Sequence, residues 1–129
     1  MRSNDVSLRE MIAAADQLLM LHTDPQAERL LRHDRAFRHS VFFEFVIIGE
    51  GVAQLSEDLK LRHPEIPWRQ ISAFRHRIAH GYLELSLGIV WQLWQNEVPR
   101  LRLQLTQVLA AEFPAQSLNA APGSPTPEE

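Results

Sequence analysis

The 129-residue chain contains no cysteine, which excludes disulfides, thiolate zinc sites and cysteine nucleophiles. Long apolar runs are also missing. The longest, VFFEFVIIG at 41–49, is interrupted by Glu44 and is far shorter than the roughly 20 residues that cross a bilayer. The opening MRSNDVSLRE lacks the apolar run of a signal peptide. These absences predict a cytoplasmic protein with no membrane segment.

A basic excess is absent as well. The formal net charge is −3, which argues against a protein that coats nucleic acid without specificity but leaves room for a local RNA-binding patch. Hydrophobic residues make up 45% of the chain and charged residues 22%, values that are ordinary for a folded domain. The length is that of one domain with a proper core.

Apolar residues at helical spacing predict helices over about 6–21, 26–61, 67–80 and 86–112. The second range contains no proline and should run with at most one adjustment, and its apolar half is read as helix rather than strand because of its length. Gly81 should end the third helix, and Pro99 should kink or break the last. The expected fold is all-α, a largely antiparallel bundle of four to five helices.

The composition changes after residue 113. Residues 114–129 hold four of the eight prolines and almost nothing to bury, so they are predicted to form a disordered, proline-rich tail. Residues 1–113 are expected to form a single helical domain.

One stripe of the second predicted helix is rich in arginine. The favoured interpretation is a solvated helix face. The alternative is a surface that follows an RNA backbone, because arginine and lysine contacts to phosphate dominate nucleic-acid affinity. The residues concerned are Arg29, Arg32, Arg35 and Arg38.

The stretch FRHRIAHGY at 74–82 has three competing interpretations. His76 and His80 are four residues apart on one helical face and could share a metal, with Glu50 as a third ligand from another helix. They could also be incidental. In the third interpretation, Arg75 and His80 form a metal-free site for RNA cleavage, since histidine moves protons near neutral pH and arginine matches phosphate geometry. Five residues apart, these two side chains point about 140° apart on a straight helix. A distorted helix end or a second subunit would have to bring them together.

Glu50 and the three tryptophans could each have a structural or a functional role. For Glu50, a structural salt bridge to Arg75 or Arg77 is favoured over direct catalysis, because an unpaired carboxylate in an apolar segment is costly. The three tryptophans are expected to anchor the core or an interface rather than to stack on bases. They are Trp68, Trp91 and Trp94.

RHRIAHGY at 75–82 resembles the R-x4-H-x-Y motif of HEPN-domain toxins, in particular the HepT branch, whose usual motif is R-N-x-x-x-H-x-Y. Three further segments are similar to the family in order and spacing: IIGEGVAQLSEDL at 47–59, HPEIPWRQI at 63–71, and IVW followed by NEVPRL within 89–101. Two positions depart from the pattern. His76 replaces the usual asparagine, and Ser86 stands where aspartate is frequent.

The resemblance implies a metal-independent endoribonuclease toxin of a toxin–antitoxin system, without a cofactor, with tRNA as the expected substrate. It implies a homodimer or higher oligomer whose catalytic cleft lies between protomers. Arg75 would hold the scissile phosphate and His80 would transfer protons, with His76 and Glu50 in support. Arg77 and the arginine stripe would contact the RNA backbone.

The resemblance also implies a protein partner. Tyr82 would be modified by AMP addition from an MntA-like nucleotidyltransferase antitoxin, which would exclude RNA by charge and bulk. The alternative is a non-catalytic helical binding module that pairs with such a nucleotidyltransferase.

Overall fold

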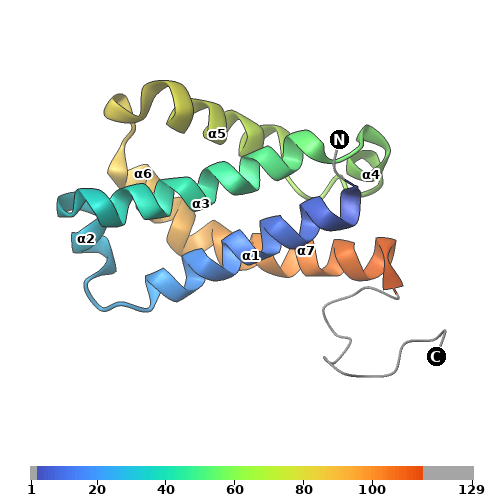
Figure 1. Ribbon diagram of the computed structural model, residues 1–129, viewed down its shortest axis with the longest axis horizontal. Helices are drawn as coiled ribbons and strands as arrows, with labels where there is room; N and C mark the ends of the chain where they lie inside the picture. The colour runs from blue at the N-terminus through green and yellow to red at the C-terminus, as the bar shows by residue number, and fades with distance from the viewer. Residues whose placement is uncertain (1–2, 115–129) are drawn as a thin grey trace.

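A computed structural model describes residues 3–114, and the predicted tail beyond Pro114 lies outside the described residues. Within the described range the chain is all-α, as predicted, and contains no strand (Figure 1). No helix in this part of the chain is both long and apolar enough to cross a membrane. The α-helices are α1 Asn4–His22, α2 Ala27–His33, α3 Arg35–Gln54, α4 Glu57–Arg62, α5 Trp68–Gly81, α6 Leu87–Gln92 and α7 Val98–Glu112.

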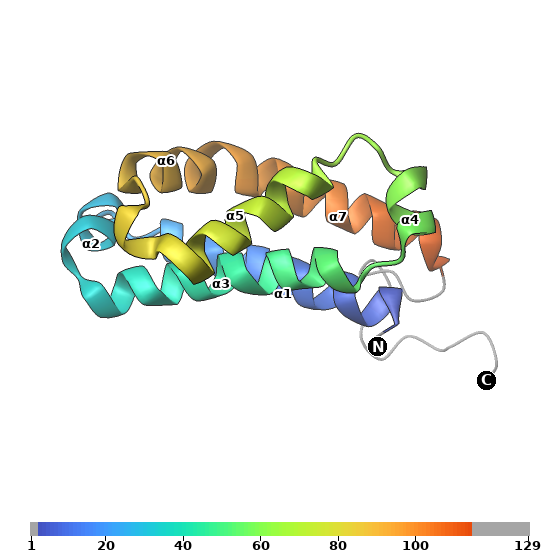
Figure 2. The ribbon, with the colours of Figure 1, turned by 90° about the horizontal axis from the view of Figure 1, so that it is seen from above.

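The bundle consists of four helical rods: α1, α3, α5 and the continuous segment from α6 to α7. Each rod runs in the opposite direction to the one before it in the chain (Figure 1). Helix α1 packs against α3 and α7, and α3 packs against α5. Seen from above, α5 crosses between α3 and the rod formed by α6 and α7 (Figure 2). The expected antiparallel bundle is therefore present, and α2 and α4 are short additions at its two ends.

Tryptophans tie the rods together. Trp94 is fully buried, and its indole Nε1–H donates to the Leu18 carbonyl of α1 at 2.8 Å. Trp91 stacks on His22 with ring centroids 4.8 Å apart. The indole of Trp68 donates to the backbone carbonyls of residues 60 and 63. All three tryptophans thus have structural roles, as expected.

The prediction of one helix with at most one adjustment over 26–61 is wrong, because two breaks occur. At the first, Asp34 caps α3 by accepting a hydrogen bond from the Phe37 N–H at 2.9 Å. The Arg38 guanidinium binds the carbonyls of Leu31 and Arg32 at 3.1 and 3.0 Å, which occupies the free end of α2. These capping contacts stabilise a turn where no proline stands.

The second break separates α3 from α4. The Ser56 hydroxyl accepts a hydrogen bond from the Leu59 N–H and thereby caps α4. Asn4, at the start of α1, donates to the same hydroxyl and accepts from the Ser56 N–H, both at 3.0 Å. A contact between distant segments therefore holds this break.

Pro99 disturbs the last rod as predicted. The five residues Leu93–Glu97 form a π-helical segment that joins α6 to α7, and Pro99 lies in the first turn of α7. Proline lacks an N–H and its ring crowds the carbonyl four residues earlier, so the wider π turn accommodates it without ending the rod.

Helix α5 ends at Gly81, as expected, and a 3-10 turn, Tyr82–Glu84, follows it directly. Pro67 precedes α5 as its N-cap residue. The segment that carries the arginine, both histidines and the tyrosine is therefore the second half of α5 and the turn after it.

Candidate active site

Arg75 lies where α5 packs most closely on α3. The inner face of α5 presents Ile78 and Phe74 to the core, and Phe74 meets Phe45 of α3 edge-on at 5.2 Å. Beside this face the stem of Arg75 crosses Gly49. A Cβ at position 49 would lie only 2.2 Å from the Arg75 Cβ. Only glycine allows this approach, so the bare backbone of α3 sets the position of the arginine.

The charged end of Arg75 is held by α3 as well. Its Nη1 lies 3.4 Å from Oε2 of Glu50, and the two side chains are 28% and 49% exposed. This is the predicted salt bridge, with Arg75 rather than Arg77 as the partner. The Nε–H of Arg75 is buried and has no hydrogen-bond partner among residues 3–114. The guanidinium is therefore oriented by the Glu50 carboxylate, and the Arg75 side chain stays partly exposed.

His76 and His80 occupy a different side of α5. Both are exposed, and their ring centroids are 4.3 Å apart with the planes tilted by 42°. Among the described residues, no hydrogen bond, ion pair or ring contact joins Arg75 to His80. The angular separation expected for five residues is thus preserved within one chain, since α5 stays helical through Gly81.

Tyr82 begins the 3-10 turn and is 40% exposed. Its ring meets His39 of α3 edge-on, with centroids 6.0 Å apart. No local pattern in the sequence connects His39 with Tyr82, because only the packing of α3 beside α5 brings them together. The contact of Gly49 with Arg75 likewise depends on this packing, although a glycine inside an apolar helix is a sign of close backbone approach.

The arginine stripe divides into two groups. Arg38 is committed to the end of α2, and Arg32 lies 3.6 Å from Glu28, one turn before it. Arg29, Arg35 and Arg77 are exposed. Arg38 therefore caps α2 and is not part of a solvated face, and contact with an RNA backbone stays a prediction for the exposed arginines.

The metal interpretation with Glu50 as third ligand finds no support in the geometry. Glu50 pairs with Arg75, whereas His76 and His80 lie on another side of α5. Within residues 3–114, no group of three or more histidine, aspartate or glutamate side chains could hold a metal ion.

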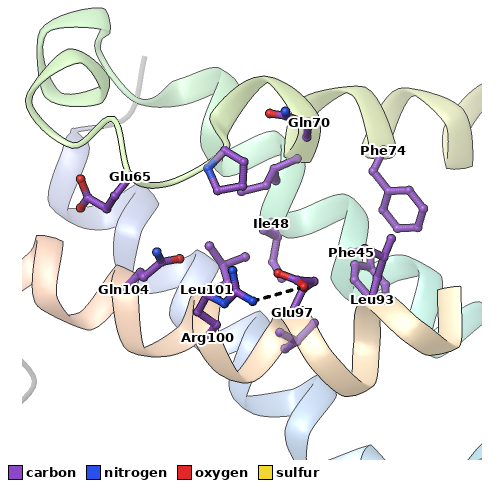
Figure 3. A pocket seen from close by; sticks show the side chains of 13 residues that line it. Phe45, Ile48, Glu65, Gln70, Phe74, Leu93, Glu97, Arg100, Leu101 and Gln104 are labelled. Carbon is purple, nitrogen blue, oxygen red and sulfur yellow. Dashed lines mark hydrogen bonds and ion pairs between the residues drawn. The ribbon is translucent and has the colours of Figure 1, made fainter. Parts of the chain in front are cut away.

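A cavity of about 330 Å³ lies elsewhere, between α5 and the rod of α6 and α7 (Figure 3). Its wall is largely apolar, with Phe45, Ile48 and Leu101 among the lining residues, and an ion pair of Glu97 and Arg100 at 3.5 Å stands at its rim. No predicted site residue lines it. The cavity and the arginine–histidine cluster are therefore separate features.

The strongest electrostatic perturbation is also remote from the cluster. Glu112, at the end of α7, accepts hydrogen bonds from Arg62 at 2.7 Å and from His63 at 2.7 Å. The Arg62 hydrogen bond is the main cause that lowers the pKa of Glu112 to about 2, with a smaller contribution from His63. The contacts of Glu112 with Arg62 and His63 join the end of α4 to the end of α7, so the role of Glu112 is structural.

The fold and the side chains on α5 define a class of protein: an all-α, HEPN-like bundle that presents an arginine, a histidine and a tyrosine near the end of one helix. A family model for HepT-like proteins, described as ribonuclease HepT-like, matches residues 8–108. The chain belongs to the HepT-like family.

Individual relatives agree with this assignment. The chain is 32% identical over 66 residues to a candidate RNase of Caldanaerobacter subterraneus, and the match covers 51% of the chain and 59% of the relative. It is 30% identical over 69 residues to a protein of Thermococcus cleftensis named probable ribonuclease HepT, with 54% and 63% covered. A candidate RNase of Methanocaldococcus jannaschii is 21% identical over 102 residues, with 79% and 87% covered. The chain thus spans about three fifths of the length of the first two relatives. No solved structure gave a significant match.

Proposed function

We propose that the protein is a metal-independent endoribonuclease that acts as a toxin, with tRNA as its substrate class. The observation that carries the proposal is the presentation of Arg75 and His80 by α5, inside the region that matches the HepT-like family. The ribonuclease names of the relatives support the same reaction class.

The chemistry assigns one role to each side chain. The Arg75 guanidinium binds the non-bridging oxygens of the scissile phosphate and stabilises the negative charge that develops there. His80 accepts the proton of the ribose 2′-hydroxyl as its oxygen attacks phosphorus. The bond from phosphorus to the 5′ oxygen breaks, that oxygen takes a proton from water, and His80 releases the proton it accepted to solvent. One product then ends in a 2′,3′-cyclic phosphate and the other in a 5′-hydroxyl.

The site is completed by a second copy of the chain, in a homodimer or higher oligomer. Arg75 and His80 of one chain do not meet, so a phosphate between them requires groups from two chains. Exposed apolar side chains flank this region, which is typical of an interface. Phe43, two turns before Glu50 on α3, is 62% exposed, and Leu83, next to Tyr82, is 85% exposed.

The first experiment is cleavage of tRNA in EDTA. Wild-type protein should cut it and leave cyclic-phosphate ends, and His80→Ala should not. His33→Ala is the matched control, because His33 is an exposed histidine on α2, outside the cluster. Cleavage that disappears on chelation, or that survives in His80→Ala, contradicts the proposal.

Mixing two inactive variants tests the shared site. In a symmetric dimer of Arg75→Ala and His80→Ala chains, one of the two clefts contains both wild-type groups. Random mixing should therefore restore about a quarter of wild-type activity. If each site belonged to a single chain, the mixture would stay inactive.

We further propose that Tyr82 is the acceptor of AMP from a nucleotidyltransferase antitoxin. Its exposure of 40% leaves the hydroxyl within reach of a partner, and AMP there would add negative charge and bulk beside His80. Incubation with such a partner and ATP should add the mass of AMP to wild-type protein but not to Tyr82→Phe, and the modified protein should lose RNA cleavage.

A second candidate function is a non-catalytic module that pairs with the nucleotidyltransferase. One observation favours it: Arg75 is already engaged by Glu50 and does not contact His80 within the chain. This function predicts that Arg75→Ala combined with His80→Ala leaves the effect on the partner intact. Expression of the wild-type chain alone would then not arrest growth.

A further inference from the structure

His76 and His80 form a pair of exposed imidazoles. They are one helical turn apart on the exposed side of α5, and their rings already face one another at a centroid distance of 4.3 Å. Within the described residues, neither imidazole takes part in a hydrogen bond or ion pair, so the ring nitrogens are free. The helix between them is continuous from Trp68 to Gly81, which holds the two side chains in register.

The distance between the rings fits coordination of one ion. Zinc–imidazole bonds are about 2.0–2.1 Å long, which places each ring centroid about 3.2 Å from the metal. When the nitrogen–metal–nitrogen angle lies between the square-planar and tetrahedral values, the two ring centroids are about 4.5–5 Å apart. The observed 4.3 Å is close to this range, so small side-chain rotations suffice and no movement of the backbone is needed.

The surroundings select the class of metal. The described residues supply no third histidine or carboxylate for the same ion. Mg²⁺ and Ca²⁺ prefer oxygen ligands and have none to use here. Zn²⁺ and Cu²⁺ bind imidazole well and can complete their coordination with water.

We propose that His76 and His80 bind one Zn²⁺ or Cu²⁺ ion and that this ion inhibits the protein. The metal forms a bond to the lone pair of a ring nitrogen of His80, which is then no longer available to accept a proton. The binding stands on the geometry of the pair alone. The inhibition rests on the proposed ribonuclease function, in which His80 carries the proton.

Zinc binding is measured first, by calorimetric titration of ZnCl₂ into full-length protein without a polyhistidine tag. Wild-type chain should bind one ion for each pair. His76→Asn and His80→Asn should each weaken binding about tenfold or more, since even the loss of a group that supports a ligand costs 10–100-fold. His33→Asn removes an isolated exposed histidine and should leave the affinity unchanged. Equal affinities in His76→Asn and the wild type would overturn the metal site.

Inhibition is measured as the ratio of tRNA cleavage in ZnCl₂ to cleavage in EDTA, taken for each variant separately. The ratio should fall several-fold in wild-type protein and in His33→Asn, and should stay near one in His76→Asn. A wild-type ratio near one, despite zinc binding, would overturn the inhibitory role. If wild-type protein cuts no RNA in EDTA, the ribonuclease assignment fails, and the calorimetry still decides whether the pair binds metal.

Discussion

Replacing Gly49 with alanine tests whether the close approach of α5 to α3 positions Arg75. The added Cβ would lie 2.2 Å from the Arg75 Cβ and 2.9 Å from its Cγ. Carbon atoms in contact are normally about 3.5–4.0 Å apart, so α5 has to move outward by about 1–2 Å. Rotation of the Arg75 side chain cannot relieve the clash, because the Cβ is fixed to the backbone of α5.

Two opposing effects set the magnitude. Overpacking of this kind costs about 1–3 kcal/mol. Alanine is favoured over glycine inside a helix by roughly 0.8–1.0 kcal/mol, which offsets part of the cost. We expect Gly49→Ala to be destabilised by about 1 kcal/mol, or about 3–5 °C in Tm for a domain of this size.

Gly88→Ala is the matched control. Gly88 is also helical, in α6, but its added Cβ would meet nothing closer than the Ser86 hydroxyl at 3.7 Å. The same chemical change should therefore raise stability by up to about 1 kcal/mol. The difference between the two variants, about 2 kcal/mol, isolates the clash because the helix preference cancels.

The assay is urea denaturation of both variants together with tRNA cleavage at a temperature where both are folded. Gly49→Ala should lose stability and cleavage, and Gly88→Ala should keep both. If Gly49→Ala proved as stable as Gly88→Ala and equally active, the contact between α3 and Arg75 would not be what holds the site.

Three further predictions concern the scaffold. Glu112→Gln removes a carboxylate whose pKa is lowered to about 2, mainly by Arg62, and should lower the free energy of unfolding by about 1 kcal/mol at neutral pH. A carboxylate with a lowered pKa stabilises the fold only above its unfolded pKa. The cost of the substitution, measured by urea denaturation, should therefore shrink as pH falls from about 4.5 towards 2. Trp94→Phe loses the buried hydrogen bond to the Leu18 carbonyl and leaves a void, so calorimetry should show the free energy of unfolding lowered by about 2–3 kcal/mol. An unchanged Tm would mean that the core repacks freely. Asp34→Ala removes the N-cap of α3 and should lower the free energy of unfolding by about 0.5–2 kcal/mol, with RNA cleavage retained. Loss of cleavage in a folded variant would instead place this turn in the active site.

Helix positions could be predicted because they depend on local periodicity. The four rods, the end of α5 at Gly81 and the disturbance at Pro99 all follow from residues close in sequence. The absence of proline over 26–61 allows for one adjustment but does not reveal two breaks. Asp34 and Ser56 are capping residues, and their side chains compete locally with continuation of the helix. Asn4 adds a contact to Ser56 that no local pattern reveals.

The partner of Glu50 could not be chosen from the sequence. Arg75 and Arg77 are both possible partners on sequence grounds, since the sequence does not give the rotation of α5 about its own axis. Packing of Phe74 and Ile78 into the core sets that rotation and turns Arg75 towards α3.

The all-α class, the approximate extents of the rods and the placement of an arginine, two histidines and a tyrosine near the end of one helix can all be derived from the amino-acid sequence. These properties depend on the spacing of residues along a single segment. Three contacts are visible only in the folded chain: Gly49 admits the stem of Arg75, Glu50 orients its guanidinium, and His39 meets Tyr82. Each of these contacts depends on how α5 lies against α3, which is set by burial of a shared apolar face rather than by either helix alone.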